Sequence, residues 1–368
     1  MRRSLPWLLA LTLSCDRPAV AEPQPAAPAP KPDVVAVSDA AQPTLQKTER
    51  RLMGTVWVIT LVGDDAAKAR AAANRAFDEV DRLEQSLSEW RPDSDISHVN
   101  QQAGIAPVKV APELIACVRA SLDVARWSNG AFDISWAALR GLWDFSAGSS
   151  HVPPSKARVK AMLPLWNYKN IVLDEANGSV FLKKKGMQIG LGGVAKGYAL
   201  DRAGESLIEA GFPNFLIYAG GQVLVHGKKG DRKWRVGIQH PREPRHFAFV
   251  EIEDGSLATS GDYEHSYEHQ GVTYHHIIDP KTGFPNRNTS SVTLLAKTAL
   301  WADAIDTAVF ILGPKRGLEM LERAPGGPFE AAVVDPNMHL SLSPHMREQL
   351  VMTAEIAADG SIGAPRAP

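Results

Sequence analysis

The sequence has few cysteines and almost no net charge. Its 368 residues include 2 cysteines, Cys15 and Cys117, and we expect no intrachain disulfide in the mature protein. Because Cys117 lies among apolar residues at helical spacing, we expect it to be a core residue. The formal net charge of -1 provides no long-range field that would attract nucleic acid or acidic membranes, so we expect no nucleic-acid binding.

Near the N-terminus, a short apolar run, Leu5 to Leu13, follows Arg2-Arg3. The run is too short to span a bilayer as a mature helix. A basic end, a short apolar segment and a small residue before a cleavage point are typical of an export signal. Leu13-Ser14-Cys15 also resembles a bacterial lipoprotein cleavage box, in which Cys15 becomes the lipidated first residue. The alternative is plain secretion with cleavage near Ala21.

The next segment, residues 18–43, is rich in Pro and Ala and has few large apolar side chains. Such a segment cannot bury a core, and we interpret it as an extended tether. We therefore divide the chain into a lipoprotein signal peptide, 1–15, a Pro/Ala-rich linker, 16–45, a folded domain, 46–345, and a C-terminal tail, 346–368. Because Asp16 resembles an inner-membrane retention signal, we expect an exported bacterial lipoprotein, anchored by its lipid on the periplasmic face of the inner membrane.

Several stretches have the periodicity of regular secondary structure. We expect helices at residues 66–88, 112–128, 195–210, 298–312 and 316–323. We expect strands at residues 53–62, 188–191, 214–218, 222–226, 234–239, 247–252, 272–278, 291–296, 331–334 and 339–342, and a hairpin over 168–183 that turns at Asn177-Gly178. Runs of consecutive strands interrupted by a few helices indicate an α+β fold with mostly antiparallel sheets and several packed helices.

The helix expected at 298–312 carries two carboxylates and a hydroxyl within an apolar run. Asp303 and Thr307 are four residues apart and lie on one face. Burial of a carboxylate is costly without a partner, and this helix has no Lys or Arg to neutralise it. A hard cation with oxygen ligands, Mg2+ or Ca2+, would provide that partner. The alternative is that the helix dipole favours an N-terminal carboxylate and the Thr hydroxyl bonds to its own helix.

A glycine turn lies in the sequence Gln188 to Tyr198, before and within the start of the helix expected at 195–210. Its glycines allow a ligand close to the backbone, and the free amides of the first helical turn favour an anion, typically a phosphate. Lys196 places a positive charge where the helix dipole disfavours one, which is unfavourable for stability and sensible for an anionic ligand. Because tight turns need glycine in any case, the turn by itself is weak support for an anion site.

Two further segments carry candidate ligand-binding side chains. His275 and His276 are adjacent in an expected strand and therefore point to opposite faces. One can face a pocket and act as a general base while the other faces solvent, and the alternative is an ordinary surface histidine. The segment Gly130-Ala131-Phe132-Asp133 and Trp90 lie near other aromatic residues, which can stack on planar rings or simply pack in the core.

These segments together resemble the FAD:protein FMN transferases, the ApbE-like flavin transferases. The matching motifs are, in chain order, Met53-Gly54-Thr55, Leu87-Ser88-Glu89-Trp90, Asp93-Ser94-Asp95-Ile96-Ser97, Gly130-Ala131-Phe132-Asp133, Leu191-Gly192-Gly193-Val194-Ala195-Lys196-Gly197-Tyr198, Ala258-Thr259-Ser260-Gly261-Asp262-Tyr263, His276-Ile277-Ile278-Asp279-Pro280-Lys281-Thr282-Gly283 and Ala302-Asp303-Ala304-Ile305-Asp306-Thr307. The resemblance covers roughly residues 53–313, and the number and order of the motifs make it specific. It implies an ApbE-like α+β fold for a flavin transferase domain at 46–345.

The resemblance implies a reaction. FAD is cleaved at its pyrophosphate with Mg2+, the FMN half is attached through a phosphoester bond to a Thr or Ser hydroxyl of an acceptor flavoprotein, and AMP leaves. The implied acceptors are flavin-carrying subunits of membrane redox complexes or exported electron carriers. Two alternatives use the same site: a Mg2+-dependent FAD pyrophosphatase with water as nucleophile, and an exported lipoprotein that binds FAD without catalysis.

The resemblance also implies roles for individual residues. The implied metal ligands are Asp303, Thr307 and the backbone carbonyl of Gly193, with Asp306 either ligating directly or supporting a ligand. The implied FAD contacts are Met53, Trp90, Ala131, Phe132, Asp133, Gly190, Lys196 and His276, and Thr259 and Asp262 are implied near the flavin. His276 matches the histidine that draws the proton from the incoming hydroxyl. Gly190 is a departure, because many relatives have an Asp there that helps to hold FAD.

Overall fold

The computed structural model describes residues 43–146 and 151–365. The expected signal peptide, the expected lipidation residue Cys15 and the expected linker as far as residue 42 lie outside these residues. The described α-helices are α1 Ala66–Leu87, α2 Asp95–Gln101, α3 Pro112–Trp127, α4 Lys156–Met162, α5 Ala195–Glu209, α6 Ala299–Arg323 and α7 Pro344–Gln349. The described 3-10 helices are η1 Ile134–Leu139, η2 Leu163–Leu165 and η3 Tyr168–Asn170.

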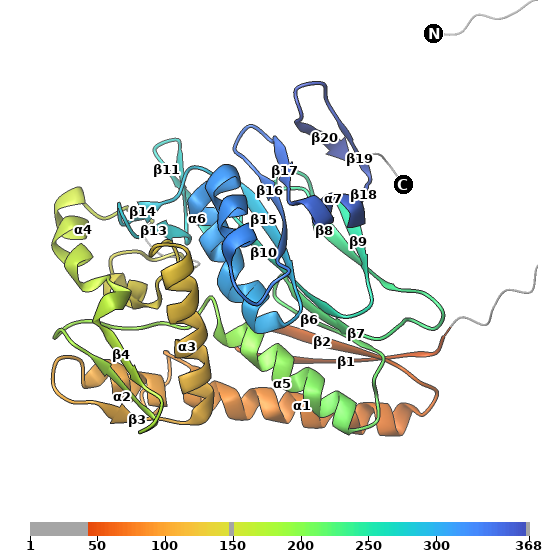
Figure 1. The fold of residues 1–368 in the computed structure, drawn as a ribbon, viewed down its shortest axis with the longest axis horizontal. Helices are drawn as coiled ribbons and strands as arrows, with labels where there is room; N and C mark the ends of the chain where they lie inside the picture. The colour runs from red at the N-terminus through yellow and green to blue at the C-terminus, as the bar shows by residue number, and fades with distance from the viewer. Residues whose placement is uncertain (1–42, 147–150, 366–368) are drawn as a thin grey trace, which may run out of the picture. The chain divides into compact units, whose positions relative to one another are not determined.

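An eight-stranded sheet is the largest sheet of the described residues (Figure 1). Its strands, in spatial order, are β1 Leu45–Leu52, β2 Thr55–Val62, β6 Phe215–Ala219, β7 Gln222–His226, β10 Gly255–Gly261, β15 Ser291–Ala296, β16 Glu330–Val334 and β17 Leu340–Leu342. Every neighbouring pair is antiparallel. Together with the helices, this sheet confirms the expected α+β class and the mostly antiparallel pairing.

Helices cover one face of this sheet. α5 packs on β6 and β7, and α6 packs on β7, β10, β15 and β16, while α1 packs on α5 and α3 packs on α6 (Figure 1). The main hydrophobic core lies among these elements and buries Trp57, Phe77 and Phe310 completely. Cys117 belongs to this core, as expected, and burial raises the pKa of its thiol. The helices that carry the predicted site are therefore fixed on a continuous core.

A second sheet covers part of the opposite face. Its strands, in spatial order, are β18 Leu350–Met352, β9 His246–Ile252 and β8 Trp234–Gln239. A second hydrophobic core joins the two sheets, and its members include Val225, Leu257, Val334, Trp234 and Phe247. Residues 331–334 of β16 alternate between the two cores and are all buried, which explains the apolar run in this part of its sequence.

The remaining strands form small sheets. They are β3 Val108–Lys109, β5 Ser179–Leu182 and β4 Ile171–Asp174 in one sheet, and the pairs β11 Ser266–His269 with β12 Val272–His275, β13 Ile278–Asp279 with β14 Phe284–Pro285, and β19 Ala354–Ile356 with β20 Ile362–Pro365. β4 and β5 form the expected hairpin around Asn177-Gly178. Part of the segment that we assigned to a C-terminal tail pairs with the domain, because β18 is hydrogen-bonded to β9.

Residues 188–191, which we expected to form a strand, have no regular secondary structure. The backbone N–H of Ile189 donates to Asn100 Oδ1 at 2.7 Å, and its carbonyl accepts from Asn100 Nδ2 at 2.9 Å. The N–H of Leu191 donates to Glu89 Oε2 at 2.7 Å. Side chains take the hydrogen bonds that a neighbouring strand would have taken, so the expected strand is wrong.

Two strands of the large sheet were not expected from the sequence. β1 is an edge strand whose residues alternate between exposed and half-buried, so its sequence is polar. β10 lies between β7 and β15, yet its sequence, GSLATSG, has mostly small side chains. The strand expected at 272–278 is divided, with β12 ending at His275 and β13 starting at Ile278. His276 therefore lies in a connection rather than in a strand.

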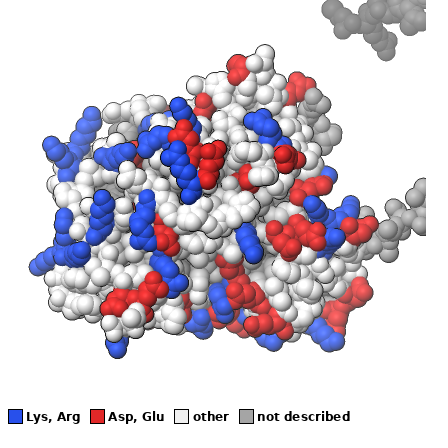
Figure 2. Space-filling model, viewed as in Figure 1, with Lys and Arg blue, Asp and Glu red and all other residues white. Residues whose placement is uncertain are grey.

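Within residues 43–146 and 151–365, no helix combines the length and the apolar character needed to cross a bilayer. The face drawn in Figure 2 carries basic side chains in blue and acidic side chains in red. The two signs are interspersed on this face, with more blue toward the left of the view. This distribution agrees with the net charge of -1 and offers no large field of one sign on the visible face.

Candidate active site

The two helices that carry Lys196 and the side chains predicted to bind the metal, α5 and α6, touch at Gly197. A Cβ atom on this glycine would lie 2.7 Å from the carbonyl carbon of Ala299 and 2.8 Å from Cβ of Asp303, closer than side chains approach. Asp201 of α5 accepts hydrogen bonds from the backbone N–H groups of Ala299 and Leu300, at 2.7 and 2.9 Å. Burial raises the pKa of Asp201 to about 6. These contacts fix the start of α6 against α5 and the glycine turn.

Asp303 is only 5% exposed, and both of its carboxylate oxygens have partners. Oδ2 accepts from the backbone N–H of Gly197 at 2.9 Å, and Oδ1 lies 3.4 Å from Nζ of Lys196. Residues 299–312 of α6 include no Lys or Arg that could pair with this carboxylate, but α5 supplies one. Lys196 and the amide together provide part of the neutralisation that burial of a carboxylate requires.

Thr307 follows Asp303 by one turn of α6 and lies near the glycine turn. A Cβ atom on Gly193 would be 3.6 Å from Thr307 Oγ1 and 3.2 Å from Phe132 Cε2. The Thr307 hydroxyl donates to Asp306 Oδ1 at 3.1 Å. It therefore bonds to a carboxylate rather than to a backbone carbonyl of its own helix, on the side of α6 that lies next to Gly193.

Asp306 is 3% exposed and also accepts from Ser260 Oγ at 2.9 Å. Burial and the negative charge of Asp303 raise the pKa of Asp306 to about 7, against the opposing effect of Ser260 and Lys196. A second buried carboxylate beside Asp303 is unfavourable near neutral pH unless another cation is present.

The oxygen atoms of Asp303, Asp306, Thr307 and the Gly193 backbone are hard ligands of the kind that Mg2+ prefers. In the described part of the chain, no three His, Cys, Asp or Glu side chains form a metal-binding group. A metal at this place would therefore depend on two carboxylates together with a hydroxyl, a carbonyl and non-protein oxygens. That donor set fits Mg2+, which usually keeps several waters and takes few protein ligands beside substrate phosphates.

The adjacent histidines differ in exposure, as expected. His275 is 2% exposed, and its Nε2 donates to the carbonyl of Asn286 at 2.7 Å while its Nδ1 accepts from the N–H of Ile277 at 3.3 Å. His275 therefore has a structural role. His276 is exposed, and its Nδ1 lies 3.3 Å from the carbonyl oxygen of Glu264. Because a carbonyl can only accept, the proton belongs on Nδ1 of His276, and Nε2 can accept another proton.

The ring of His276 reaches solvent, but protein atoms surround it. Their desolvating effect, together with His265, His275 and Lys196, lowers the pKa of His276 to about 4, while the exposed edge of the ring moderates this effect. The imidazole is therefore neutral near pH 7. Since Lys196 lowers the pKa of both His276 and Asp306, the histidine and the carboxylates are arranged around the same ammonium group.

The motif Gly130-Ala131-Phe132-Asp133 lies at the glycine turn through Phe132, whose ring is next to Gly193. Ala131, Phe132 and Asp133 are all buried. The Asp133 carboxylate caps η1 through Ser135 and accepts from the N–H of Tyr168 at 2.7 Å. Burial raises the pKa of Asp133 to about 6. The hydrogen bonds of Asp133 are thus structural, and Phe132 is the member of this motif that meets the glycine turn.

Two predicted FAD contacts lie on other elements. Met53 is in the tight β1–β2 turn with Gly54, and both have positive φ, 47° and 75°. The N–H of Met53 donates to Glu84 Oε2 of α1 at 2.8 Å. Trp90 follows the end of α1 and is 76% exposed, so its indole is available to a ligand. Positive φ is strained for methionine, a feature that often accompanies functional turns.

Thr259 and Asp262 have partners within the fold. Thr259 Oγ1 is 2.9 Å from Thr293 Oγ1, and Asp262 forms a two-point ion pair with Arg242 at 2.7 and 2.8 Å. The residue of this strand that bonds to Asp306 is Ser260, which we did not single out from the sequence. Strand alternation was the available signal, because a residue next to Thr259 points to the opposite face, toward α6.

Gly190, the departure from the family pattern, has no room for a side chain. A Cβ atom there would lie 2.5 Å from Glu89 Oε2. The Glu89 carboxylate accepts from the N–H of Leu191 at 2.7 Å, and its other oxygen lies 2.7 Å from Arg140 Nη2. A carboxylate therefore lies beside Gly190 although residue 190 is glycine, and the sequence analysis did not single out the residue that supplies it.

α6 breaks at Gly313-Pro314, where the glycine has φ 78° and ψ 176°. Proline has no N–H to donate to the carbonyl of Phe310, four residues earlier. That carbonyl accepts from Thr289 Oγ1 at 2.8 Å, and the next one, of Ile311, accepts from Asn286 Nδ2 at 3.0 Å. The break ties this end of α6 to the segment that follows β14.

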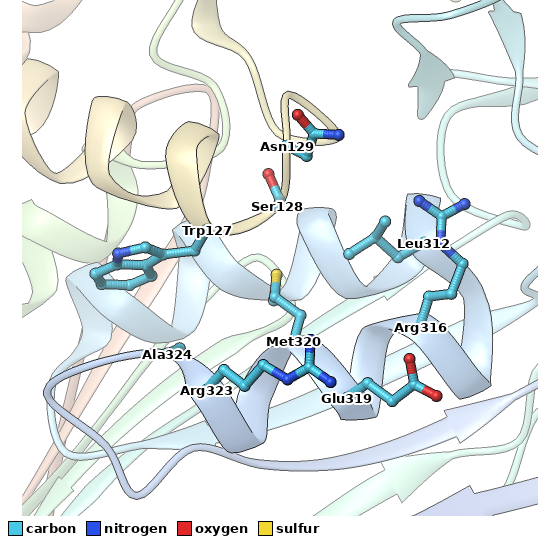
Figure 3. Close-up of a pocket in the computed structure, with 9 residues that line it drawn as sticks. All are labelled: Trp127, Ser128, Asn129, Leu312, Arg316, Glu319, Met320, Arg323 and Ala324. Carbon is cyan, nitrogen blue, oxygen red and sulfur yellow. The ribbon is translucent and has the colours of Figure 1, made fainter.

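A separate pocket of about 260 Å³ lies between the end of α3 and the part of α6 beyond its break (Figure 3). Trp127, Arg316 and Arg323 are among its lining residues. None of the predicted site residues lines this pocket. Shape alone therefore does not identify the predicted site, which is distinguished by its buried carboxylates, ammonium group and histidine.

Comparisons with known sequences identify the family of the chain. The model of the ApbE family matches residues 53–330. The chain is 32% identical over 278 residues to an FAD:protein FMN transferase of Klebsiella pneumoniae, across 74% of this chain and 79% of that protein. It is 35% identical over 278 residues to an FAD:protein FMN transferase of Treponema pallidum, across 71% of this chain and 76% of that protein.

Solved structures share the fold. The ApbE protein of Thermotoga maritima superposes with a TM-score of 0.76 at 30% identity, across 83% of this chain and 99% of that chain. The flavin transferase ApbE of Vibrio cholerae superposes with a TM-score of 0.75 at 23% identity, with the same coverage of 83% and 99%. The chain therefore belongs to the ApbE family of flavin transferases, as the order of its motifs predicted.

Proposed function

We propose that this protein transfers the FMN half of FAD to a Thr or Ser hydroxyl of an acceptor flavoprotein, in a Mg2+-dependent reaction that releases AMP. The names of its relatives support the FAD:protein FMN transferase activity. One observation carries the rest of the proposal: two buried carboxylates, Asp303 and Asp306, lie beside Lys196 and near a neutral histidine. Such a group suits displacement at a diphosphate, which needs charge neutralisation and a positioned nucleophile.

Asp303, Asp306, Thr307 and the carbonyl of Gly193 would hold the Mg2+. When bound, the ion supplies positive charge that neutralises the diphosphate and the leaving phosphate. Lys196 adds a second positive charge 3.4 Å from Asp303, and the first amides of α5 add partial positive charge. The negative charge of the FAD diphosphate is thus matched from both helices.

His276 would accept the proton of the acceptor hydroxyl at Nε2. The hydroxyl oxygen then forms a bond to the FMN phosphorus, and the bond from that phosphorus to the bridging oxygen breaks. AMP leaves with the bridging oxygen and its electron pair. The lowered pKa of His276 keeps the imidazole neutral at physiological pH, and its exposure lets a protein acceptor approach.

Residues on three sides of the glycine turn would contact FAD. The exposed indole of Trp90 offers a face for a planar ring, and Phe132 and Met53 offer apolar surface. Lys196 and His276 face the phosphates in this proposal. The remaining proposed contacts, Ala131, Asp133 and Gly190, are buried and would shape the floor of the site.

Incubation of the purified protein with FAD, Mg2+ and a candidate acceptor tests the proposal. We expect the intact mass of the acceptor to rise by one phosphoester-linked FMN, with one AMP released per modified acceptor and no reaction in EDTA. The control is an acceptor whose target hydroxyl is replaced by Ala. Acceptors that stay unmodified while the protein is folded and loaded with FAD would contradict the proposal.

A hydrolase is the second candidate, because the exposure of His276 also admits water. AMP release without acceptor, at a rate that acceptor does not change, would favour an FAD pyrophosphatase. A non-enzymatic FAD-binding lipoprotein predicts instead that Asp303→Ala leaves both FAD binding and biological role intact. The same mass and AMP measurements separate the three activities.

We also propose that lipidation of Cys15 holds the enzyme on the periplasmic face of the inner membrane. Its acceptors would be flavin-carrying subunits of membrane redox complexes or exported electron carriers. The support is the signal-like sequence before Cys15 and the Pro/Ala-rich segment after it. Cys15→Ala should abolish incorporation of a labelled fatty acid and release the protein from the membrane fraction. Unchanged membrane association of this variant would contradict the anchor.

A further inference from the structure

Glu89 and Arg140, which we call the clamp, join three segments at the edge of the glycine turn. Glu89 follows α1, Arg140 follows η1, and Leu191 belongs to the turn. Glu89 Oε2 accepts from the N–H of Leu191 at 2.7 Å, and Oε1 lies 2.7 Å from Arg140 Nη2. Arg140 Nη1 also donates to the backbone carbonyl of Glu89 at 3.4 Å. The clamp thus connects the end of α1 to the glycine turn.

The clamp is mostly withdrawn from solvent. The Glu89 side chain is 7% exposed, and the Arg140 side chain is 26% exposed. Burial raises the pKa of Glu89, while Arg140 and the Leu191 amide oppose that effect. Desolvation offsets much of the attraction in a buried ion pair, so stability alone does not account for charges at this place.

Trp90 lies directly against the clamp. The Arg140 guanidinium is 4.7 Å from the centre of the Trp90 ring and 5.8 Å from that of Trp136. Trp136 Nε1 in turn donates to the carbonyl of Gly190 at 3.3 Å. Trp90 is 76% exposed, and a cation over one face of an exposed indole restricts its rotamers while the other face stays open to a planar ligand.

We propose that Glu89 and Arg140 are positioning residues that fix the indole of Trp90 relative to the glycine turn. Stacking of FAD on Trp90 and presentation of the Gly193 carbonyl then occur in one arrangement. This inference rests on the proposed function, because it assigns FAD as the planar ligand. Glu89 Oε2 and the ring of Trp136 together occupy the space in which a side chain at residue 190 would begin.

Two substitutions separate the charge from the shape of the clamp. Glu89→Gln keeps the length and an acceptor for the Leu191 amide, and Arg140→Met keeps an aliphatic chain without the guanidinium. We expect each to raise the Kd for FAD about tenfold, which corresponds to about 1.4 kcal/mol. The double variant should be no weaker than the weaker single variant, because both changes break the same pair.

The matched control is Glu175→Gln, which breaks an exposed ion pair with Arg119 at 2.9 Å between α3 and the β4–β5 hairpin. It should leave the Kd for FAD unchanged, as titrated by calorimetry in the presence of Mg2+. An unchanged Kd in both clamp variants, or losses that add in the double variant, would overturn the coupling. A fall in thermal stability with unchanged FAD affinity would show a purely structural role and also overturn it.

A second measurement needs no FAD. In protein labelled with fluorotryptophan, the Trp90 resonance is assigned by its loss in Trp90→Phe. We expect Glu89→Gln and Arg140→Met to shift and narrow this resonance, since the indole becomes free to rotate, and Glu175→Gln to leave it in place. An unmoved resonance in both clamp variants would overturn the clamp. If the unaltered protein binds no FAD, the proposed function fails, and the fluorine spectrum still decides whether Glu89 and Arg140 fix Trp90.

Discussion

The charge on Asp306 is predicted to destabilise the metal-free protein as the pH rises. Burial and the charge of Asp303 raise the pKa of Asp306 from 3.8 to about 7. Because the folded-state pKa is raised, the favourable contribution of the neutral acid is fully present below the unfolded pKa and is lost as the pH rises through about 7. The difference between the two pKa values corresponds to roughly 4 kcal/mol of unfolding free energy.

Asp306→Asn tests this reasoning, because it removes the charge and nearly keeps the shape. In EDTA, the variant should be more stable than the unaltered protein by roughly 4 kcal/mol at about pH 8 and by roughly 2 kcal/mol at about pH 5. Urea unfolding at both pH values measures the difference. Comparison with the unaltered protein cancels the other buried acids in this range, Asp133 and Asp201, each with a pKa of about 6.

Mg2+ provides the second arm of the test. The ion should stabilise the unaltered protein at about pH 8 and leave Asp306→Asn nearly unaffected, because binding to the folded state adds stability in proportion to affinity. If the unaltered protein in EDTA keeps the same stability relative to Asp306→Asn at both pH values, the buried-charge argument is refuted. Equal stabilisation of both proteins by Mg2+ would refute the role of Asp306 in holding the ion.

Three further substitutions test other parts of the site. Gly197→Ala should lower the free energy of unfolding by about 1–3 kcal/mol, because its Cβ would meet the backbone of Ala299. An unfolding free energy equal to that of the unaltered protein, measured in urea, would contradict the close contact between the helices. His276→Gln should slow single-turnover FMN transfer by about a hundredfold or more while the affinity for FAD changes little. Equal losses in the transfer rate and in FAD affinity would contradict its proposed role as the base. Lys196→Met should weaken FAD binding and, as seen by NMR titration, raise the pKa of His276, since Lys196 now lowers it; an unchanged pKa would separate the two side chains.

The parts of the site that depend on local periodicity were predictable from the sequence. Asp303 and Thr307 lie on one side of α6 because helix spacing requires it. The two adjacent histidines differ in exposure, but the sequence did not indicate which one is buried, and the strand that was expected to contain both ends at His275. The α+β class followed from the same periodicities. The order of the motifs indicated the family, which the comparisons confirm.

The parts that depend on distant residues were not predictable. Lys196 pairs with Asp303 across 107 positions of sequence, and Glu89 reaches Leu191 across 102. The spacing of residues along the sequence does not predict such long-range pairs, since they form only when helices and loops pack together. The strand wrongly expected at 188–191 has the same cause, because side chains from elsewhere take its backbone hydrogen bonds. The metal ligands and FAD contacts themselves stay predictions.

The interruption of α6 at Gly313-Pro314 has a mechanical consequence. At the break, two helix carbonyls accept hydrogen bonds from the side chains of Asn286 and Thr289. The backbone carbonyl of Asn286 also accepts a hydrogen bond from the ring of His275. These hydrogen bonds connect the segment that contains His276 to α6, the helix that contains Asp303 and Asp306. A straight, uninterrupted helix would satisfy its own carbonyls and would lose these contacts, so the break in the helix fixes the proposed base relative to the two carboxylates.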